Sequence, residues 1–178
     1  MTDLTDEQGE RDDGSSDEVA AFDSAHFRQV LGHFPTGVTV ITARTPEGPV
    51  GLAIGSFTSV SLEPPLVAFC PDKRSSSWPR IREAGAFCVN VLAEDQELVS
   101  RTFASKGADK FQGVGWEAAS TGSPRLAGVL AWIDCTIEAV HDGGDHEICV
   151  GRVREMDVGH EADGPLVFYR GGYGRFEP

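Results

Sequence analysis

The sequence contains no long hydrophobic run and little positive charge. No stretch reaches the roughly 18 consecutive apolar residues of a membrane-spanning helix, and the N-terminus lacks the basic and apolar regions of a secretory signal peptide. The 178 residues include 28 acidic and 15 basic side chains, which gives a formal net charge of −13. An acidic chain without a basic stripe is repelled by phosphate backbones. These absences predict a cytoplasmic protein with neither a membrane nor a nucleic acid as partner.

Several motifs of catalysis and cofactor binding are also missing. There is no C-x-x-C pair, no P-loop, no G-x-G-x-x-G after a strand and no nucleophile elbow. A doubly wound dinucleotide-binding fold and nucleophilic catalysis are therefore disfavoured. The four cysteines, which lie inside apolar runs, favour buried reduced thiols over a disulfide or a metal site; they are Cys70, Cys88, Cys135 and Cys149.

One domain is expected, preceded by an acidic tail. A chain of 178 residues with 40% apolar content is long enough for one domain with a real core. Residues 1–23 contain nine acidic residues, one basic residue (Arg11) and few apolar side chains. Such a segment buries too little apolar surface to offset the entropy of ordering, so it is predicted to be disordered. The folded domain is then expected over 24–178.

Short strands dominate the expected domain, with a few helices around them. Apolar residues at helical spacing, including Phe27 and Leu31, predict an amphipathic helix over 24–34, and two more helices are predicted over 75–85 and 94–104. The predicted strands cover 37–44, 49–61, 66–70, 87–93, 126–142, 146–158 and part of 165–176. Because strands and helices do not alternate, we expect a mainly β fold, a small antiparallel barrel with peripheral helices.

Small and hydroxylated residues gather in the predicted strand over 49–61. Glycines in a strand, such as Gly51 and Gly55, let a flat ligand approach the backbone closely. A planar ring system could lie against this strand. An ordinary polar face of a barrel explains the same spacing.

Two basic segments could bind a phosphate or a ring. The residues 73–77, KRSSS, stand at the start of a predicted helix, where free amides and the helix dipole favour an anion. Serine at this position is equally explained by helix capping. The second segment combines Lys110 and Phe111 with Arg101, Thr102 and Phe103 of the preceding helix, and a solvated helix face is the alternative there.

The stretch EAVHDGGDHEICVG, residues 138–151, places histidines and aspartates around two glycines. His141, Asp142, Asp145 and His146 superficially resemble metal ligands. Two flexible glycines suit the tight turn of a β-hairpin better, and no third histidine lies nearby in the sequence. We therefore expect a hairpin turn and no metal site.

Eight blocks in order resemble the flavin reductase family with the FMN-binding split barrel. They are FRQVLGHFPTGVTVITA, GLAIGSFTSVSLEPPLVAFCP, SSSW, FCVNVLAEDQ, DKFQGVGW, GSPRLAGVLAWIDC, GGDHEICVGRV and PLVFYRGGYG, within about residues 26–176. The chain is most similar to the reductase components of two-component flavin-dependent monooxygenases, including those of phenolic and steroid-ring compounds. The resemblance implies a homodimeric, six-stranded antiparallel split β-barrel with the flavin near the dimer interface.

The resemblance also implies where the cofactors bind. The flavin ring and ribityl chain would contact Val50, Gly51, Leu52, Ala53, Gly55, Ser56, Cys70, Pro71 and Asp72. The phosphate end would meet Ser76 and Ser77, with Thr102, Phe103, Lys110 and Phe111 nearby, and Tyr169, Arg170 and Tyr173 would shape the mouth of the site. His146 would be the catalytic residue on the nicotinamide side. Ala53 stands where many relatives carry threonine, which leaves only backbone contacts at that position.

The implied reaction is hydride transfer from NADH or NADPH to FMN or FAD, after which reduced flavin leaves for a partner monooxygenase. The cofactors carry this chemistry, so no general base is needed for the hydride itself. His146 would position the nicotinamide or assist a proton step. Two alternatives remain open: a flavin-binding storage or sensor protein, and an oxidoreductase with tightly bound FMN acting on another substrate.

Overall fold

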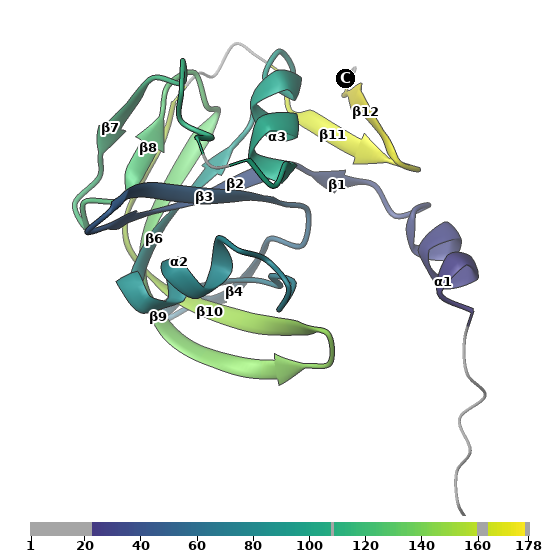
Figure 1. Ribbon diagram of the computed structural model, residues 1–178, viewed down its shortest axis with the longest axis horizontal. Helices are drawn as coiled ribbons and strands as arrows, with labels where there is room; N and C mark the ends of the chain where they lie inside the picture. Colours follow the sequence, from purple (N-terminus) through teal and green to yellow (C-terminus); the bar gives the residue numbers. More distant parts are fainter. Residues whose placement is uncertain (1–22, 108, 160–163, 177–178) are drawn as a thin grey trace, which may run out of the picture.

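The computed structural model describes residues 23–107, 109–159 and 164–176, and β-sheets make up most of them (Figure 1). The main sheet is antiparallel, with the strand order β3-β2-β6-β9-β10-β5-β4. Its strands are β2 (Thr39–Thr45), β3 (Gly48–Ile54), β4 (Thr58–Leu62), β5 (Pro65–Phe69), β6 (Ala86–Val91), β9 (Ala131–Gly143) and β10 (His146–Val158). The expected mainly β fold with peripheral helices is confirmed.

Two smaller sheets and three helices complete the described fold. One sheet has the order β1-β11-β12 and the other pairs β7 with β8. Their strands are β1 (Thr36–Gly37), β11 (Leu166–Tyr169), β12 (Gly172–Arg175), β7 (Trp116–Ala118) and β8 (Pro124–Leu126). The helices are α1 (Ser24–Leu31), α2 (Trp78–Ala84) and α3 (Glu97–Ala104). No helix of the described part is long and apolar enough to cross a membrane.

The main sheet has seven strands, whereas the resemblance implies a six-stranded barrel. The single strand expected over 49–61 is divided by residues 55–57 into β3 and β4. At this break the hydroxyl of Ser56 accepts the N–H of Cys70 at 2.9 Å and lies 3.3 Å from the Cys70 carbonyl, so a side chain replaces the strand ladder. As a result, seven strands pair in the described main sheet, and β3 and β4 form its two edges.

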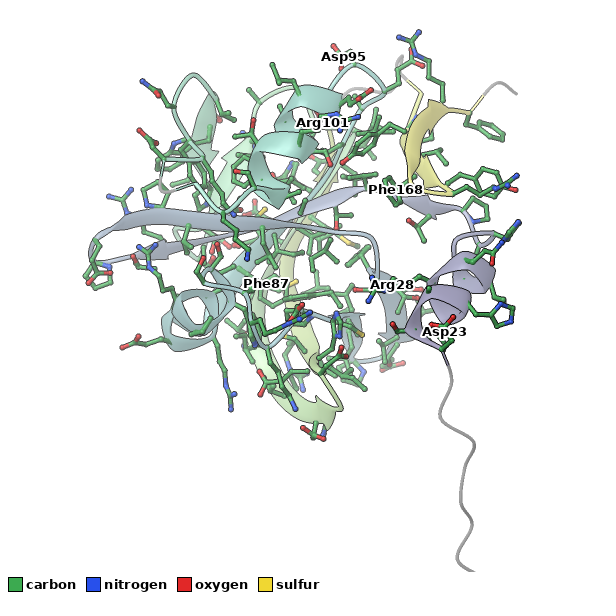
Figure 2. The ribbon with its side chains drawn as sticks, turned by 45° about the vertical axis from the view of Figure 1, so that its right-hand side comes forward. Asp23, Arg28, Phe87, Asp95, Arg101 and Phe168 are labelled. Atoms are coloured by element: carbon green, nitrogen blue, oxygen red, sulfur yellow. The ribbon has the colours of Figure 1, made fainter. Side chains whose placement is uncertain are left out.

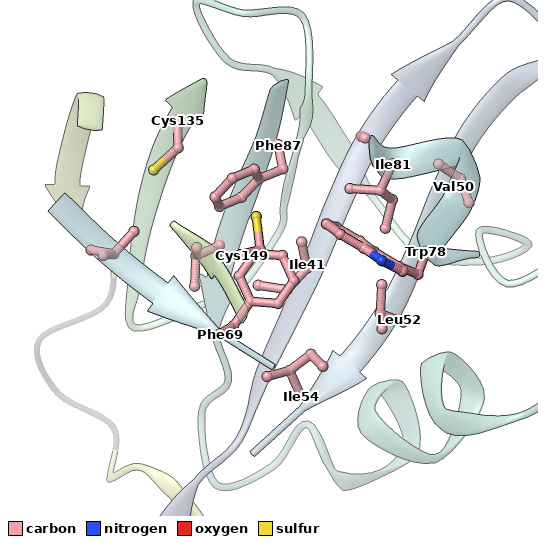
Figure 3. Close-up of a cluster of buried hydrophobic side chains, with 13 residues drawn as sticks. Ile41, Val50, Leu52, Ile54, Phe69, Trp78, Ile81, Phe87, Cys135 and Cys149 are labelled. Carbon is pink, nitrogen blue, oxygen red and sulfur yellow. The ribbon is translucent and has the colours of Figure 1, made fainter. Parts of the chain in front are cut away.

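Apolar side chains pack on both faces of the main sheet because successive residues of a strand point to opposite sides. On β2, Ile41 belongs to one buried cluster and Val40 to the other. The first cluster, shown in Figure 3, contains Phe69 in edge-to-face contact with Trp78 of α2 and Phe87 of β6, at centroid distances of 5.7 and 5.1 Å. α2 therefore covers the first cluster, whereas α3 contributes Phe103 to the second.

Buried polar side chains attach the β7–β8 hairpin, which the sequence does not predict. Asn90 of β6 accepts the N–H of Leu126 on β8 at 2.7 Å, and its amide donates to backbone and hydroxyl oxygens of the neighbouring strands. The fully buried carboxylate of Asp134 accepts hydrogen bonds from the hydroxyls of Ser120 and Thr121 and from the Thr121 N–H. These bonds satisfy both buried groups, and together with Leu126 and Trp116, which pack in the second cluster, they attach the hairpin to the main sheet.

The first helix forms where it is expected, but its apolar face has no cover. α1 is capped by Asp23, whose carboxylate accepts the N–H of Ala25 at 3.0 Å. Phe27 and Leu31 are each 54% exposed, and Phe34 just beyond the helix is 74% exposed. Figure 2 shows α1 at the side of the sheets. An exposed apolar stripe of this kind marks an interaction surface. The expected acidic tail lies, apart from Asp23, outside the described residues.

Candidate active site

A cleft of 790 Å³ opens between the end of β3, the 70–77 loop and the segment that follows α3. Its volume lies within the range of small-molecule sites. The predicted site residues that line it are Leu52, Ala53, Gly55, Ser56, Cys70, Asp72, Ser76, Ser77, Phe103, Lys110 and His146. Segments far apart in the sequence thus supply the walls of one cleft.

β3 and the ring of Phe103 form one wall of the cleft. Gly51 does not line the cleft but lies buried behind it, and a Cβ at this position would come within 2.6 Å of the Phe103 ring. The glycine therefore lets Phe103 pack directly on β3. Small side chains at Ala53 and Gly55 leave the neighbouring backbone accessible to a flat ligand.

The serine-rich loop forms the opposite wall. The hydroxyl of Ser75, rather than that of Ser77, accepts the N–H groups of Ser77 and Trp78 at the start of α2. The hydroxyl of Ser76 is exposed on the cleft. Arg74 also lines the cleft and forms an ion pair with Asp72 at 2.9 Å. This arginine, through side-chain and backbone hydrogen bonds, holds the pKa of Asp72 at about 2.

Lys110 links three parts of the cleft. Its ammonium donates to the carbonyls of Phe103 and Gly51 at 2.9 and 3.2 Å, and to the hydroxyl of Ser77 at 3.4 Å. Partial burial lowers the pKa of this ammonium. Lys110 thus joins α3, β3 and the serine-rich loop while its positive charge remains beside the cleft, where it favours an anion.

His146 stands at the cleft where β10 begins. Its Nδ1 lies 2.7 Å from the carboxylate of Asp145, which also lowers the pKa of Asp145. A backbone bridge joins His146 to Asp72, and the Glu147 N–H donates to the Pro71 carbonyl at 3.0 Å. No hydrogen bond to Nε2 forms among the described residues, so this nitrogen is available to a ligand. The imidazole is therefore oriented by its neighbour and remains half-exposed.

Four predicted cofactor residues lie outside the lining of this cleft, like Gly51. Val50 is buried in the first hydrophobic cluster, and Pro71 is buried beneath the start of β10. The hydroxyl of Thr102 donates to the Leu98 carbonyl within α3, and Phe111 packs edge-to-face on Phe103 at 5.0 Å. Val50 and Phe111 therefore pack behind the walls, whereas the Thr102 hydroxyl is used within its own helix.

The three C-terminal residues predicted at the mouth also lie outside the cleft of their own chain. Tyr169, Arg170 and Tyr173 belong to the β11–β12 hairpin, which pairs with β1. The Tyr173 hydroxyl lies 2.9 Å from that of Ser100 on α3, and the Arg101 guanidinium stacks on its ring at 4.8 Å. Pairing with β1 therefore places this hairpin beside α3 and away from the cleft.

Other lining residues lie outside the set that the family resemblance implies. They are Ile54, Arg74, Ser75, Ala104, Ser105 and Lys106. The basic and serine-rich pattern of 73–77 already points to Arg74 and Ser75. Ser105 and Lys106 directly follow α3, and only the packing of that helix against β3 brings them to the cleft.

The side chains around the hairpin turn have partners other than a metal. Asp142 is paired with Lys73 and His146 with Asp145. Within the described ranges, no group of three His, Cys, Asp or Glu side chains is arranged to hold a metal ion.

The fold and the cleft define a β-sheet protein with a site suited to a planar, anionic ligand. A family model described as flavin reductase like domain matches residues 31–177. The chain is 55% identical over 158 residues to a flavin reductase of Pseudomonas putida, covering 88% of this chain and 92% of that protein. It is 52% identical to the reductase subunit HsaB of a flavin-dependent monooxygenase of Rhodococcus jostii, covering 89% and 80%.

Solved structures agree with the sequence matches. The NADH:FAD oxidoreductase SgcE6 of Streptomyces globisporus, in complex with NAD and FAD fragments, superposes with a TM-score of 0.83 at 39% identity. That match covers 88% of this chain and 94% of the other. The chain belongs to the flavin reductase-like family, which confirms the resemblance recognised in the sequence.

The accessibility of Cys70 provides a direct test of where the flavin binds. Burial raises the pKa of the Cys135 and Cys149 thiols to about 12 and also raises that of Cys88, whereas Cys70 is half-buried in the cleft. We expect a thiol reagent at pH 8 to modify Cys70 first, because thiolates react and buried thiols do not.

Flavin at ten times its Kd should slow this reaction about tenfold if it occupies the cleft. The reaction would be followed by absorbance, with Cys70→Ser as the control that removes the fast thiol. An unchanged rate in the presence of FMN or FAD would place the flavin elsewhere.

Proposed function

We propose that this protein is an NAD(P)H:flavin oxidoreductase that supplies reduced FMN or FAD to a partner flavin-dependent monooxygenase. The observation that carries the proposal is one cleft with His146 at one side and a basic, serine-rich loop at another, in a chain of this family. The relatives described above include a reductase subunit of a monooxygenase and an NADH:FAD oxidoreductase. Another relative is named FMN reductase (NADH). These names bear out the expected enzyme class, a flavin substrate and NADH as electron donor.

The residues present fit a flavin. Arg74, Lys106 and Lys110 outnumber Asp72 among the charged side chains of the cleft, which favours a phosphate. The hydroxyls of the serine-rich loop can donate to phosphate oxygens, and the wall at Ala53 and Gly55 can accept a flat ring. The phosphate end would therefore lie at the 74–77 loop and the ring beside β3.

The chemistry of hydride acceptance at N5 is supplied by the flavin when it is bound. The protein holds the flavin by β3 and the serine-rich loop, with the nicotinamide expected at the His146 side. Hydrogen-bond donors beside the negative charge that develops on the flavin would stabilise it more strongly in a cleft than in bulk water. His146 can accept through Nε2 a hydrogen bond from the nicotinamide amide N–H, while the Asp145 carboxylate accepts the Nδ1 N–H and orients the ring. We assign no general base to the hydride step.

Steady-state oxidation of NAD(P)H with added flavin as the varied substrate tests this function. Saturation with added FMN or FAD is expected, because reduced flavin must leave for the oxygenase. Activity that is indifferent to added flavin would instead support an oxidoreductase with tightly bound FMN. Tight flavin binding without NAD(P)H oxidation would support a storage or sensor protein.

We also propose that the working form is a cytoplasmic homodimer with the split barrel of the family. The exposed face of α1 and Phe34 supports this, as does a neighbouring apolar groove of 630 Å³ that includes Phe34, Pro35 and Phe57. Gly55 and Ser56 line both this groove and the cleft. A second copy seated on α1 would thus border the flavin. Closure of six of the seven main-sheet strands into a barrel is part of this proposal.

Two substitutions on α1 test the dimer. Phe27→Glu combined with Leu31→Glu is expected to convert a dimer of the wild-type chain into a monomer, because two charges would be buried in an apolar interface. Sedimentation velocity measures the change. Met156→Glu, an exposed apolar residue of β10, is the matched control and should stay dimeric. A wild-type protein that sediments as a monomer at all concentrations would contradict the proposal.

A further inference from the structure

The Lys73 side chain does not line the cleft and instead binds the turn between β9 and β10. Its ammonium forms an ion pair with Asp142 and donates to the Gly144 carbonyl at 2.5 Å. Its own N–H donates to the Asp145 carbonyl at 3.1 Å. Lys73 therefore contacts three residues of the turn just before His146, namely Asp142, Gly144 and Asp145. Its neighbour Arg74 instead lines the cleft.

These contacts matter because, among the described residues, the hydrogen bonds between residues 142–145 and other elements all come from Lys73, whereas Glu147 beyond His146 is also held by Trp78 and Arg82 of α2. β10 pairs with β5 only from Cys149 to Arg152, so the residues nearer the turn lie beyond the end of β5. Figure 1 shows the β9–β10 hairpin projecting from the sheet there. Residues 141–145 are exposed. The loop 71–73 takes the place of β5, through the Pro71 carbonyl, the Asp72 bridge to His146 and the three Lys73 contacts.

The contribution of Lys73 is mainly geometric. The Asp142 side chain is 80% exposed, and an exposed ion pair contributes little to stability in water. The hydrogen bond from Lys73 does lower the pKa of Asp142, so this carboxylate stays charged throughout the neutral range. Because the ammonium binds a side chain and a backbone carbonyl of the same turn, it restricts both the position and the direction of the turn.

We propose that Lys73 is a positioning residue that sets where His146 stands relative to the cleft. The inference rests on the proposed function, in which His146 meets the nicotinamide. The loop that carries Lys73 continues directly into the serines at the expected phosphate end. The same short loop would then hold the flavin at one end and position His146 at the other. One element would therefore align the flavin with the nicotinamide.

Lys73→Met tests the proposal, because methionine keeps most of the length of the side chain without its charge or donors. We expect the KM for NADH or NADPH to rise about fivefold or more, since small displacements of a positioning group are costly. The Kd of the flavin and the melting temperature should stay at the wild-type values. The 15N resonances of the His146 ring should move. Lys73→Arg, which keeps a cation within reach of the turn, should recover part of the loss.

Arg152→Met is the matched control. It removes the bidentate ion pair of Arg152 with Glu138 in the same hairpin, away from the turn. Its KM and its His146 resonances should match the wild type. Asp142→Asn removes the other charge of the same ion pair, on the exposed turn. It should also raise the KM for the nicotinamide, and it tests the proposal even if Lys73→Met fails to fold.

The outcomes separate this inference from the proposed function. A wild-type protein without NAD(P)H oxidation rejects the function, and the His146 resonances still report on the position of the turn. An active wild type with unchanged KM and unchanged His146 resonances in both Lys73→Met and Asp142→Asn overturns the positioning role.

Discussion

Replacing His146 with alanine is expected to lower NAD(P)H oxidation roughly 10- to 100-fold, because a misplaced nicotinamide loses much of the advantage of alignment. The fold should be retained, since the imidazole is 42% exposed and packs in neither hydrophobic cluster. Flavin binding should be retained as well, because β3, Lys110 and the serine-rich loop are unchanged. The measurements are kcat/KM for the nicotinamide at saturating flavin and the Kd of the flavin from its fluorescence.

His141→Ala is the control for this variant. His141 lies on β9 of the same hairpin, is exposed and pairs with Ile148 across the ladder, outside the lining of the cleft. Its removal should leave turnover unchanged. Unchanged turnover in His146→Ala would refute the assignment of His146 to the nicotinamide. Failure of His146→Ala to fold would show that the histidine serves the hairpin rather than the reaction.

Gly151→Val is expected to destabilise the protein by about 3 kcal/mol through overpacking of the core. A Cβ at Gly151 would overlap Cζ of Phe87, lie 2.9 Å from Cε1 of the same ring and lie 3.3 Å from Cβ of Cys135. Phe87 is completely buried and packs edge-to-face on Phe69 at 5.1 Å (Figure 3). Because this ring is completely buried against other core side chains, the added side chain must displace the ring or the strand.

Thermal or urea unfolding measures this loss. For a chain of this length, 3 kcal/mol corresponds to a fall in Tm of about 6–12 °C. Gly174→Ala provides the control, because a Cβ on this exposed β12 glycine meets no atom within 4 Å. Its Tm should stay close to that of the wild type. A wild-type Tm for Gly151→Val would mean that the packing around Phe87 is looser than the structure indicates.

Local patterns predicted the elements that depend on neighbouring residues. β10 runs from His146 to Val158, as the alternation of apolar residues and the glycine turn indicate. The helix expected over 94–104 forms as α3, Glu97–Ala104, and the one expected over 75–85 as the shorter α2, Trp78–Ala84. In these cases spacing and turn chemistry act within a few residues, so no distant contact is needed to decide the outcome.

Other features depend on contacts that the local sequence does not contain. The break between β3 and β4 follows from the bonds of Ser56 to Cys70, and β7–β8 is held by Asn90 and Asp134. The apolar spacing of α1 predicts a helix but not whether its face is covered. Tyr173 lies against α3 because its hairpin pairs with β1.

The sequence by itself determined the β-rich fold, most of the helices and strands, the family and the segments that supply the site. The tertiary structure decided which side chains of those segments face the cleft. Lys73 and Arg74 are adjacent and both basic, yet Arg74 lines the cleft and Lys73 holds the turn before His146. The reason is physical: both residues lie in a turn, where no strand alternation sets the side-chain direction, so contacts with Asp142 and Gly144 for Lys73 and with Asp72 for Arg74 decide it.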